Sequence, residues 1–175
     1  MPGPLFLRGE SVELHTIESE DVQFLAETIN DPAVRRSLSR TEPVSLAQEE
    51  EWLESHRESD DVHLLITANG DPVGTIGLHH LNDRMGVAEV GYSVAPDAQG
   101  QGIATDATRT VVRYAFEEVG LHRVSARAFA TNEASQRVLE KVGFEREGVS
   151  REEAFVGGER VDTVRFGLLA EDWDR

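Results

Sequence analysis

The pattern of apolar and polar positions along the chain changes its period several times. Runs rich in β-branched and aromatic residues indicate strands. They alternate with segments whose apolar residues recur at helical spacing. The predicted strands cover residues 5–7, 12–17, 62–68, 73–81, 88–94, 123–129, 144–151 and 161–169, and the predicted helices cover residues 20–30, 45–58, 103–119 and 132–142. The first two strand runs are short pieces around a turn.

Turn residues and helix breakers divide these segments. Asn69-Gly70 joins two strand runs and is a strong hairpin signal. Asp31-Pro32 is expected to end the first helix, and the polar stretch 35–43 is expected to be a loop. The two strand runs around Asn69-Gly70 and the next strand along the chain are therefore predicted to form an antiparallel meander.

One connection between strands differs from the others. The strand at 88–94 is followed by the helix at 103–119 and then by the strand at 123–129. A helix between two strands of one sheet indicates a parallel step. The whole pattern predicts an α+β fold, and residues 1–175, in which no linker or repeat is visible, are expected to form a single domain.

A glycine-containing loop lies between the strand at 88–94 and the helix that begins near Ile103. Its residues are Gln99, Gly100, Gln101, Gly102, Ile103 and Ala104. The first N–H groups of a helix have no intrahelical partners, and the helix dipole adds partial positive charge there. The two glycines remove the Cβ atoms that would keep an anion away. The loop therefore suits a diphosphate, although an ordinary strand-to-helix turn would also explain these residues.

Two common phosphate-binding patterns do not fit this loop. The dinucleotide pattern G-x-G-x-x-G requires glycine where Thr105 stands, and the NTP-binding pattern requires a lysine, whereas the only lysine is Lys141. Gln99-x-x-Gly102-x-Ala104 instead resembles the [RQ]-x-x-G-x-[GA] signature of the GCN5-related N-acetyltransferases (GNAT), which grip the pyrophosphate of coenzyme A. This resemblance implies that residues 99–104 bind acetyl-CoA, the acetyl donor.

A second segment carries a more specific resemblance to the same family. Residues 131–144, TNEASQRVLEKVGF, resemble its N-x-x-S-x-x-[VL]-[LY]-x-x-x-G-F segment, in the ribosomal-protein N-terminal acetyltransferase (RimJ/RimL-like) branch. The resemblance is dense from Val73 to Trp173 and thin before it. It implies the GNAT fold, a single mixed, mostly antiparallel, twisted sheet of about seven strands flanked by about four helices. Homodimers are common in the family, so a homodimer is expected by analogy.

The resemblance also assigns roles to individual residues. Asn132 would hold coenzyme A. Ser135, on the same side of the helix start, would lie near the thioester sulfur and act as a general acid or hydrogen-bond donor for the leaving thiolate. A backbone N–H of the central strand near Val94 would polarise the thioester carbonyl. Two short polar residues at a helix start are also common caps, and this alternative stays open.

Glu89 is the candidate general base. It points to the same face of its strand as Gly91, and a carboxylate beside a glycine indicates a cleft. An α-amino group loses its proton at neutral pH for roughly 1 kcal/mol, whereas a lysine side chain requires about 4–5 kcal/mol. A protein N-terminus therefore needs only a modest base, such as a carboxylate acting through water. The alternative is that Glu89 pairs with an arginine such as Arg127 on the neighbouring strand.

Composition narrows the expected partners and location. The chain has 33 acidic and 17 basic residues and a net charge of −16, which disfavours nucleic acid and anionic membranes. The acidic residues are spread along the chain, which favours adaptation to a high-salt cytoplasm over a field that attracts cationic substrates. No apolar run approaches the roughly 20 residues of a membrane span. Cysteine is absent and no secretory leader is visible, so a cytoplasmic protein is expected.

Two adjacent histidines, His79 and His80, raise the question of a metal site. Adjacent residues on a strand point to opposite faces, so the two rings cannot easily bind one ion. The chain has no cysteine and no His-x-x-x-His pattern, and no metal is therefore expected. Either histidine could instead line the acceptor cleft.

The function expected from these residues is acetyl-CoA-dependent N-acetyl transfer by direct attack of an amine on the thioester. The first acceptor considered is the α-amino group of a protein, such as a ribosomal protein. Two alternatives stay open. The acceptor could be a small amine, such as a polyamine, an amino acid or an aminoglycoside, or the chain could be a non-catalytic module that binds coenzyme A.

Overall fold

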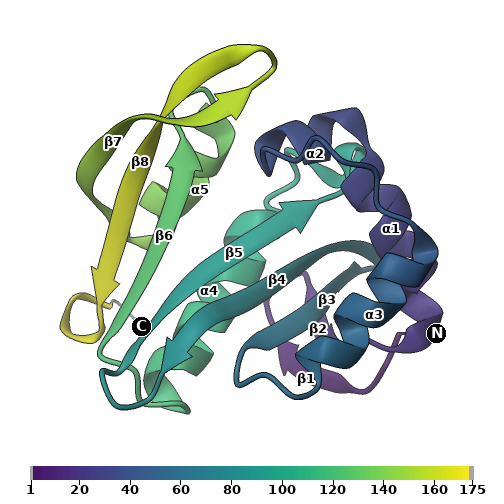
Figure 1. Cartoon of the computed structure of the whole chain (residues 1–175). Coiled ribbons are helices and arrows are strands. Elements are labelled where there is room, and N and C mark those ends of the chain that lie inside the picture. The colour runs from purple at the N-terminus through teal and green to yellow at the C-terminus, as the bar shows by residue number, and fades with distance from the viewer. Residues whose placement is uncertain (1, 174–175) are drawn as a thin grey trace.

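One mixed sheet organises the computed structural model, which describes residues 2–173 (Figure 1). Within these residues the sheet has eight strands in the order β1-β2-β3-β4-β5-β6-β8-β7. The strands are β1 (Leu5–Arg8), β2 (Glu13–Thr16), β3 (Val62–Ala68), β4 (Asp71–Asn82), β5 (Val87–Val94), β6 (Arg123–Phe129), β7 (Glu145–Val156) and β8 (Glu159–Leu169). Neighbours are antiparallel except β5 and β6. The predicted α+β class, the meander of β3, β4 and β5 and the single parallel step are confirmed.

Helices cover both faces of this sheet. The α-helices of the described residues are α1 (Val22–Asn30), α2 (Pro32–Ser37), α3 (Leu46–His56), α4 (Ile103–Glu117) and α5 (Glu133–Val142). Figure 1 shows α4 and α5 behind the sheet and α1 and α3 in front of it. Among residues 2–173, no helix is both long and apolar enough to cross a membrane. The eight strands match the eight strand runs of the sequence pattern and exceed by one the number that the resemblance implied, and α2 is a helix that was not expected.

Helix α2 corrects the expectation that residues 35–43 form a loop. One carboxylate oxygen of Asp31 accepts hydrogen bonds from the N–H groups of Ala33, at 2.8 Å, and Val34, at 3.4 Å. Pro32 occupies the first helical position, where a missing N–H removes no helical bond. The dipeptide that ends α1 therefore also begins α2.

The turns of the sheet follow the glycines. Asn69 and Gly70 between β3 and β4 both have positive φ, 53° and 87°, as a tight hairpin turn requires. The turn at Gly157-Gly158 joins β7 and β8, and both strands extend further toward it than their apolar patterns indicate.

The two faces of the sheet bury different side chains. On the α4 and α5 face, alternate residues of the central strands pack against the helices in the larger core; examples are Leu64, Ile76, Val90, Val111 and Leu139. On the α1 and α3 face a smaller cluster contains Ile17, Val22, Leu25, Leu53 and Leu65, with Phe24 and Trp52 beside it. This alternation places Glu89 and Gly91 on the α1 and α3 face, and Val90 and Tyr92 on the other.

Asp106 ties α4 to the turn between β1 and β2. Its carboxylate accepts hydrogen bonds from the N–H groups of Glu10 at 3.0 Å, Ser11 at 2.7 Å and Val12 at 3.1 Å, and from the Ser11 hydroxyl at 2.9 Å. Burial raises the pKa of Asp106, but the hydrogen bonds from Ser11, Glu10 and Val12 outweigh it, and the net pKa is lowered. The side chain is buried, and a Cβ on Gly9 would lie 2.7 Å from its Oδ1. The turn therefore holds an ionised carboxylate.

Candidate active site

A gap opens in the middle of the sheet where β5 and β6, the only parallel neighbours among the described residues, separate. The ladder between β5 and β6 joins Val87 to Arg123, Ala88 to Val124 and Glu89 to Ser125, and it ends there. Beyond Glu89 the two strands diverge (Figure 1). β6 continues to pair with β8 as far as Phe129, and β5 continues to pair with β4 as far as Val94. The gap thus has a continuous strand on each side and helices on each face.

The predicted phosphate loop lies at the end of β5, on the side of α4. Gly100 and Gly102 have positive φ values of 76° and 81°, and no heavy atom lies within 4 Å of a Cβ built on either. Gly102 is the N-cap of α4 and offers no side-chain acceptor to the first N–H groups of the helix. The N–H groups of Ile103 and Ala104 therefore have no intrahelical or side-chain cap partner at the positive end of a helix of 15 residues. These features fit the pyrophosphate of coenzyme A.

The two glutamines of the loop bind the backbone rather than leaving their side chains free. Gln99 Nε2 donates to the carbonyl of Val94 at 3.0 Å, and Gln101 Nε2 donates to the carbonyl of Asp97 at 3.0 Å. Gln99 thereby ties the loop to the end of β5. The role of a backbone N–H near Val94 stays a prediction, with Val94 at the end of β5 opposite Gly74.

Ser135 contacts a residue that the sequence did not indicate. The hydroxyl of Tyr92 on β5 lies 2.8 Å from Ser135 Oγ on α5, and either can be the donor. Burial raises the pKa of Tyr92, partly offset by its hydrogen bond with Ser135, so the phenol stays protonated at neutral pH. Asn132 Oδ1 accepts from the N–H of Ser135 at 3.1 Å, so Asn132 is also the N-cap of α5. Asn132 therefore does serve as a helix cap, through its side-chain oxygen, and this hydrogen bond does not use its amide nitrogen.

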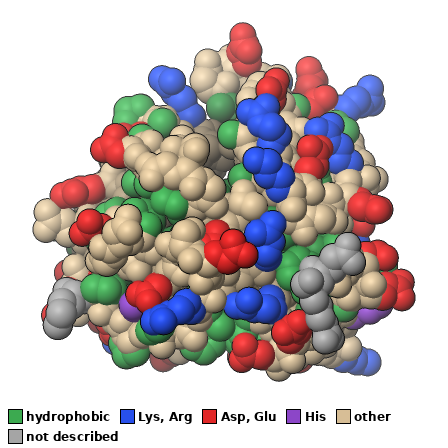
Figure 2. All heavy atoms as spheres, turned by 180° about the vertical axis from the view of Figure 1, so that it is seen from behind, with side chains coloured by type: hydrophobic (Ala, Val, Ile, Leu, Met, Phe, Trp, Pro, Cys, Tyr) green, Lys and Arg blue, Asp and Glu red, His purple; other side chains and the backbone are tan. Residues whose placement is uncertain are grey.

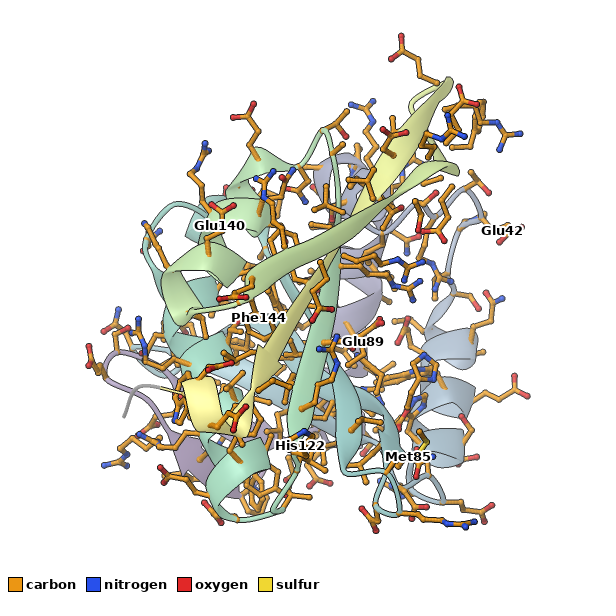
Figure 3. The ribbon with its side chains drawn as sticks, turned by 90° about the vertical axis from the view of Figure 1, so that its left-hand side faces the viewer. Glu42, Met85, Glu89, His122, Glu140 and Phe144 are labelled. Atoms are coloured by element: carbon orange, nitrogen blue, oxygen red, sulfur yellow. The ribbon has the colours of Figure 1, made fainter. Side chains whose placement is uncertain are left out.

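Glu89 lies on the opposite face, where the gap begins. Figure 3 shows it between β6 and the helices α1 to α3, whereas Glu140 and Phe144 lie on the α4 and α5 side. Arg127 Nε of β6 lies 3.0 Å from Glu89 Oε1, so the alternative of an ion pair with Arg127 is present in the structure. The pair is partly open to solvent, with 22% of the Glu89 side chain and 51% of the Arg127 side chain exposed, and such pairs contribute at most about 1 kcal/mol. Glu89 can therefore exchange partners at low cost.

A cluster of aromatic and imidazole rings borders Glu89 on this face. His79 is its register partner on β4, and the His79 ring leans over Gly91, where a Cβ would lie 3.1 Å from Nε2. The ring centroid of His63 on β3 lies 4.8 Å from that of His79. Trp52 and His56 of α3 cover His63 at 5.2 and 4.1 Å. His80, by contrast, is exposed. Trp52 packs α3 against the smaller hydrophobic cluster on this face of the sheet.

Both inner histidines are neutral at pH 7. Burial lowers the pKa of His63 to about 4, and the neighbouring His79 and His56 act in the same direction. Burial also lowers the pKa of His79, although Asp61 and Glu89 partly oppose it. Glu49 of α3 is also buried, and burial raises its pKa, partly offset by Arg40. The face around Glu89 thus contains the Glu89 carboxylate and the neutral imidazoles of His63 and His79.

The opposite face of the molecule, seen in Figure 2, is hollowed in its upper part and has acidic and basic side chains interspersed over the rest. The gap between β5 and β6 thus lies between the loop at residues 99–104, on the side of α4 and α5, and Glu89 with its imidazole neighbours on the other face.

Comparison with known proteins identifies the family to which this fold belongs. A family model described as "Acetyltransferase (GNAT) domain" matches residues 11–145. The chain therefore belongs to the GNAT acetyltransferase family, and the resemblance found in the loop and in α5 is confirmed. The prediction of an N-acetyltransferase is confirmed with it, because the curated relatives are named N-acetyltransferases.

Two curated relatives differ in the acceptor that their names imply. The chain is 32% identical over 174 residues, 95% of each protein, to "Putative ribosomal N-acetyltransferase YdaF" of Bacillus subtilis. It is 24% identical over 166 residues, 94% of this chain and 89% of the relative, to spermidine N(1)-acetyltransferase of Escherichia coli. Among solved structures, spermidine N-acetyltransferase from Vibrio cholerae in complex with CoA and spermine is similar in fold, with a TM-score of 0.87 and 22% identity over 93% of this chain and 97% of that one.

Proposed function

We propose that this chain transfers the acetyl group of acetyl-CoA to the α-amino group of a protein or peptide. The observation that carries the proposal is the gap between β5 and β6, which has unpartnered helical N–H groups at one side and Glu89 at the other. The N–H groups of residues 102–104 bind the pyrophosphate and fix the donor. Acetyl-CoA supplies the activated thioester when bound, and the residues of the chain orient it and manage the protons.

Two hydroxyl groups serve the leaving thiolate. Tyr92 and Ser135 form a hydrogen-bonded pair on the donor side of the gap, and both are protonated at neutral pH. A thiol has an ordinary pKa of about 8.5, so a hydrogen bond from Ser135, supported by Tyr92, suffices without a strong acid. The amide nitrogen of Asn132, whose oxygen caps α5, contributes to holding coenzyme A.

The basic groups at the acceptor face favour an α-amino acceptor. Glu89 is a carboxylate paired with Arg127, and His63 and His79 have lowered pKa values. None of these is a strong base. An α-amino group, with a pKa of about 7.7–8.0, is partly neutral at pH 7 without help, whereas an alkylamine with a pKa near 10.4 is not. Glu89, acting through water, takes the proton released when the amine attacks.

A second candidate acceptor is a small polyamine. The net charge of −16 and the similarity to spermidine acetyltransferases favour it. A cationic acceptor would gain from these charges but would require a larger cost for deprotonation. If a polyamine is the acceptor, we expect the rate of its acetylation to keep rising steeply as the pH is raised toward the pKa of the amine.

One panel of acceptors separates these proposals. Initial rates of acetyl-CoA consumption are measured with short peptides that have a free N-terminus, with the same peptides blocked at the N-terminus and carrying an internal lysine, and with spermidine. We expect the highest kcat/KM for the free N-termini. A preference for spermidine would transfer the assignment to the second candidate. Tight acetyl-CoA binding without turnover would support the non-catalytic module.

Two variants test the residues themselves. Glu89→Gln is expected to lower kcat by about 10²-fold if Glu89 is the base. Glu140→Gln is the matched control, because Glu140 forms a similar pair with Arg146 at 2.9 Å on the opposite side of the sheet (Figure 3). Equal rates for both variants across the pH range would remove Glu89 from the mechanism.

The donor site has its own control. Gly102→Val is expected to weaken acetyl-CoA binding in a calorimeter by at least about tenfold, the equivalent of one charge-assisted hydrogen bond. Gly120→Val imposes similar backbone strain at the far end of α4, because Gly120 has a φ of 78° and its Cβ position is equally open. Unchanged affinity in the Gly102 variant would overturn the donor site.

A further inference from the structure

Three side chains from separate segments converge beside the acceptor face. Asp61 precedes β3, His63 lies on β3 and His79 lies on β4, and each offers one donor atom such that all three atoms lie within 4.8 Å of one another. The adjacent pair His79 and His80 does not form this group. His63 and His79 are diagonal neighbours on the paired strands, because His63 faces Gly77 across the ladder.

The backbone makes room for the two imidazole rings. A Cβ on Gly77 would lie 3.2 Å from His63 Nδ1 and 3.3 Å from a carbon of the His79 ring, so both rings lean over this glycine. Gly91 gives the same space to the other edge of His79. A side chain at either position would push the rings apart, and the cluster thus depends on two glycines in adjacent strands.

The donors are oriented and incompletely satisfied. The N–H of Leu81 donates to one carboxylate oxygen of Asp61 at 3.2 Å, which fixes the carboxylate. His63 Nε2 is buried and has no hydrogen-bond partner. A buried polar atom without a partner costs free energy and calls for an explanation such as an ion or a water molecule. The walls are completed by His56, whose Nδ1 donates to the carbonyl of Trp52 at 3.0 Å.

We propose that Asp61, His63 and His79 form a binding site for a divalent transition-metal ion of the zinc class. Imidazole and carboxylate groups are the nitrogen and oxygen ligands that Zn²⁺ accepts, and three protein ligands leave one tetrahedral position for water. Neutral imidazole is the form that binds metals. Small rotations bring the donors from their present separations to the approximately 2 Å metal–ligand distances of such a site.

The position of this site links it to the acceptor face. His79 is the register partner of Glu89, so a bound dication would add positive charge next to that carboxylate. It would also connect β3, β4 and the segment before β3, which are the elements that α3 covers. The expected effect on the protein is therefore an increase in thermal stability that does not depend on acetyl-CoA.

The test uses the full chain and Zn²⁺ alone. Calorimetry in molar KCl, which screens weak binding to the acidic surface, is expected to show one saturable zinc ion per chain, and Mg²⁺ is expected not to compete. Loss of a supporting group outside the ligand shell already costs 10- to 100-fold in metal affinity, so His63→Gln, His79→Gln and Asp61→Asn are each expected to cost at least about 100-fold. His80→Gln, at an exposed residue outside this group of ligands, is the matched control and is expected to bind normally.

A second measurement distinguishes coordination from unspecific association. Co²⁺ in place of Zn²⁺ is expected to give the intense visible absorption of a tetrahedral site, lost in His79→Gln but retained in His80→Gln. Melting curves without metal show whether each variant folds. If one ligand variant does not fold, the zinc affinities of the other ligand variants test the site. No zinc binding, equal binding by all variants, or a loss in His80→Gln as large as in His79→Gln would overturn the site. None of these readouts uses catalytic activity.

Discussion

Asp106→Asn tests the bond network that holds α4 to the β1–β2 turn. The substitution keeps the shape of the side chain and removes its charge. The amide oxygen can still accept from Ser11 and Val12, but the NH₂ group then faces the N–H of Glu10, which now lies 3.0 Å from a carboxylate oxygen. Two donors cannot bond, so at least one charge-assisted hydrogen bond is lost and an unfavourable contact replaces it.

The magnitude follows from these contacts. A hydrogen bond to a charged group contributes about 1.5–3 kcal/mol, and contributions within one network are not additive. We therefore expect Asp106→Asn to lower the free energy of unfolding by about 2 kcal/mol. For a chain of 175 residues this corresponds to a fall in melting temperature of about 4–8 °C. Gly9→Ala should act similarly from the other side, because its Cβ would lie 2.7 Å from Asp106 Oδ1.

The assay is urea denaturation at several pH values. The native pKa of Asp106 is lowered from 3.8, so its stabilising contribution is fully present above pH 3.8 and is lost as the pH falls through the native pKa. The difference between the wild type and Asp106→Asn should thus be constant from pH 7 to pH 5 and should shrink below about pH 3.8. Asp83→Asn, at an exposed turn residue, removes the same charge without these bonds. Equal stability of the Asp106 and Asp83 variants would refute the reasoning.

Two other expectations follow from the hydroxyl pair and from the charge. Tyr92→Phe removes the hydrogen-bond partner of Ser135 Oγ and should change kcat more than KM. Ser135→Ala should lower kcat at least as much as Tyr92→Phe does. If steady-state kinetics show a smaller effect for Ser135→Ala, Tyr92 rather than Ser135 is the main hydrogen-bond donor to the thiolate. The melting temperature should rise as KCl is increased toward molar concentrations, because salt screens repulsion among 33 acidic residues; a midpoint independent of KCl would exclude adaptation to high salt.

Much of the fold could be predicted because its signals are local. The hairpin at Asn69-Gly70 and the glycine loop before α4 each act within a few residues. Helix α2 was missed because Asp31-Pro32 is a stop signal and a start signal at once. β7 was predicted too short because it is largely exposed, and its sequence therefore lacks the apolar alternation that marks a strand.

The candidate site divides in the same way. Residues of one segment, such as those of the loop at 99–104, could be recognised together. The contact of Tyr92 with Ser135 spans 43 positions, and the convergence of His63 and His79 depends on the register of two strands. Register is determined by the whole sheet, so such pairs are not visible in a single sequence. Alternation did place Tyr92 on the face opposite Glu89, and that was the available signal.

The short parallel ladder supports the proposed binding of coenzyme A in the gap. Within the described residues, β5 pairs only with β4 after Glu89, so the backbone N–H and C=O groups on its β6 side have no strand to hydrogen-bond with. Such groups need partners, and a ligand with amides in an extended arm can supply them where a simple nucleotide cannot. Coenzyme A has amides between its phosphates and its thiol. Glu89 is the last residue of β5 that pairs with β6, so in the proposed function acyl donor and amine would meet where this parallel ladder ends.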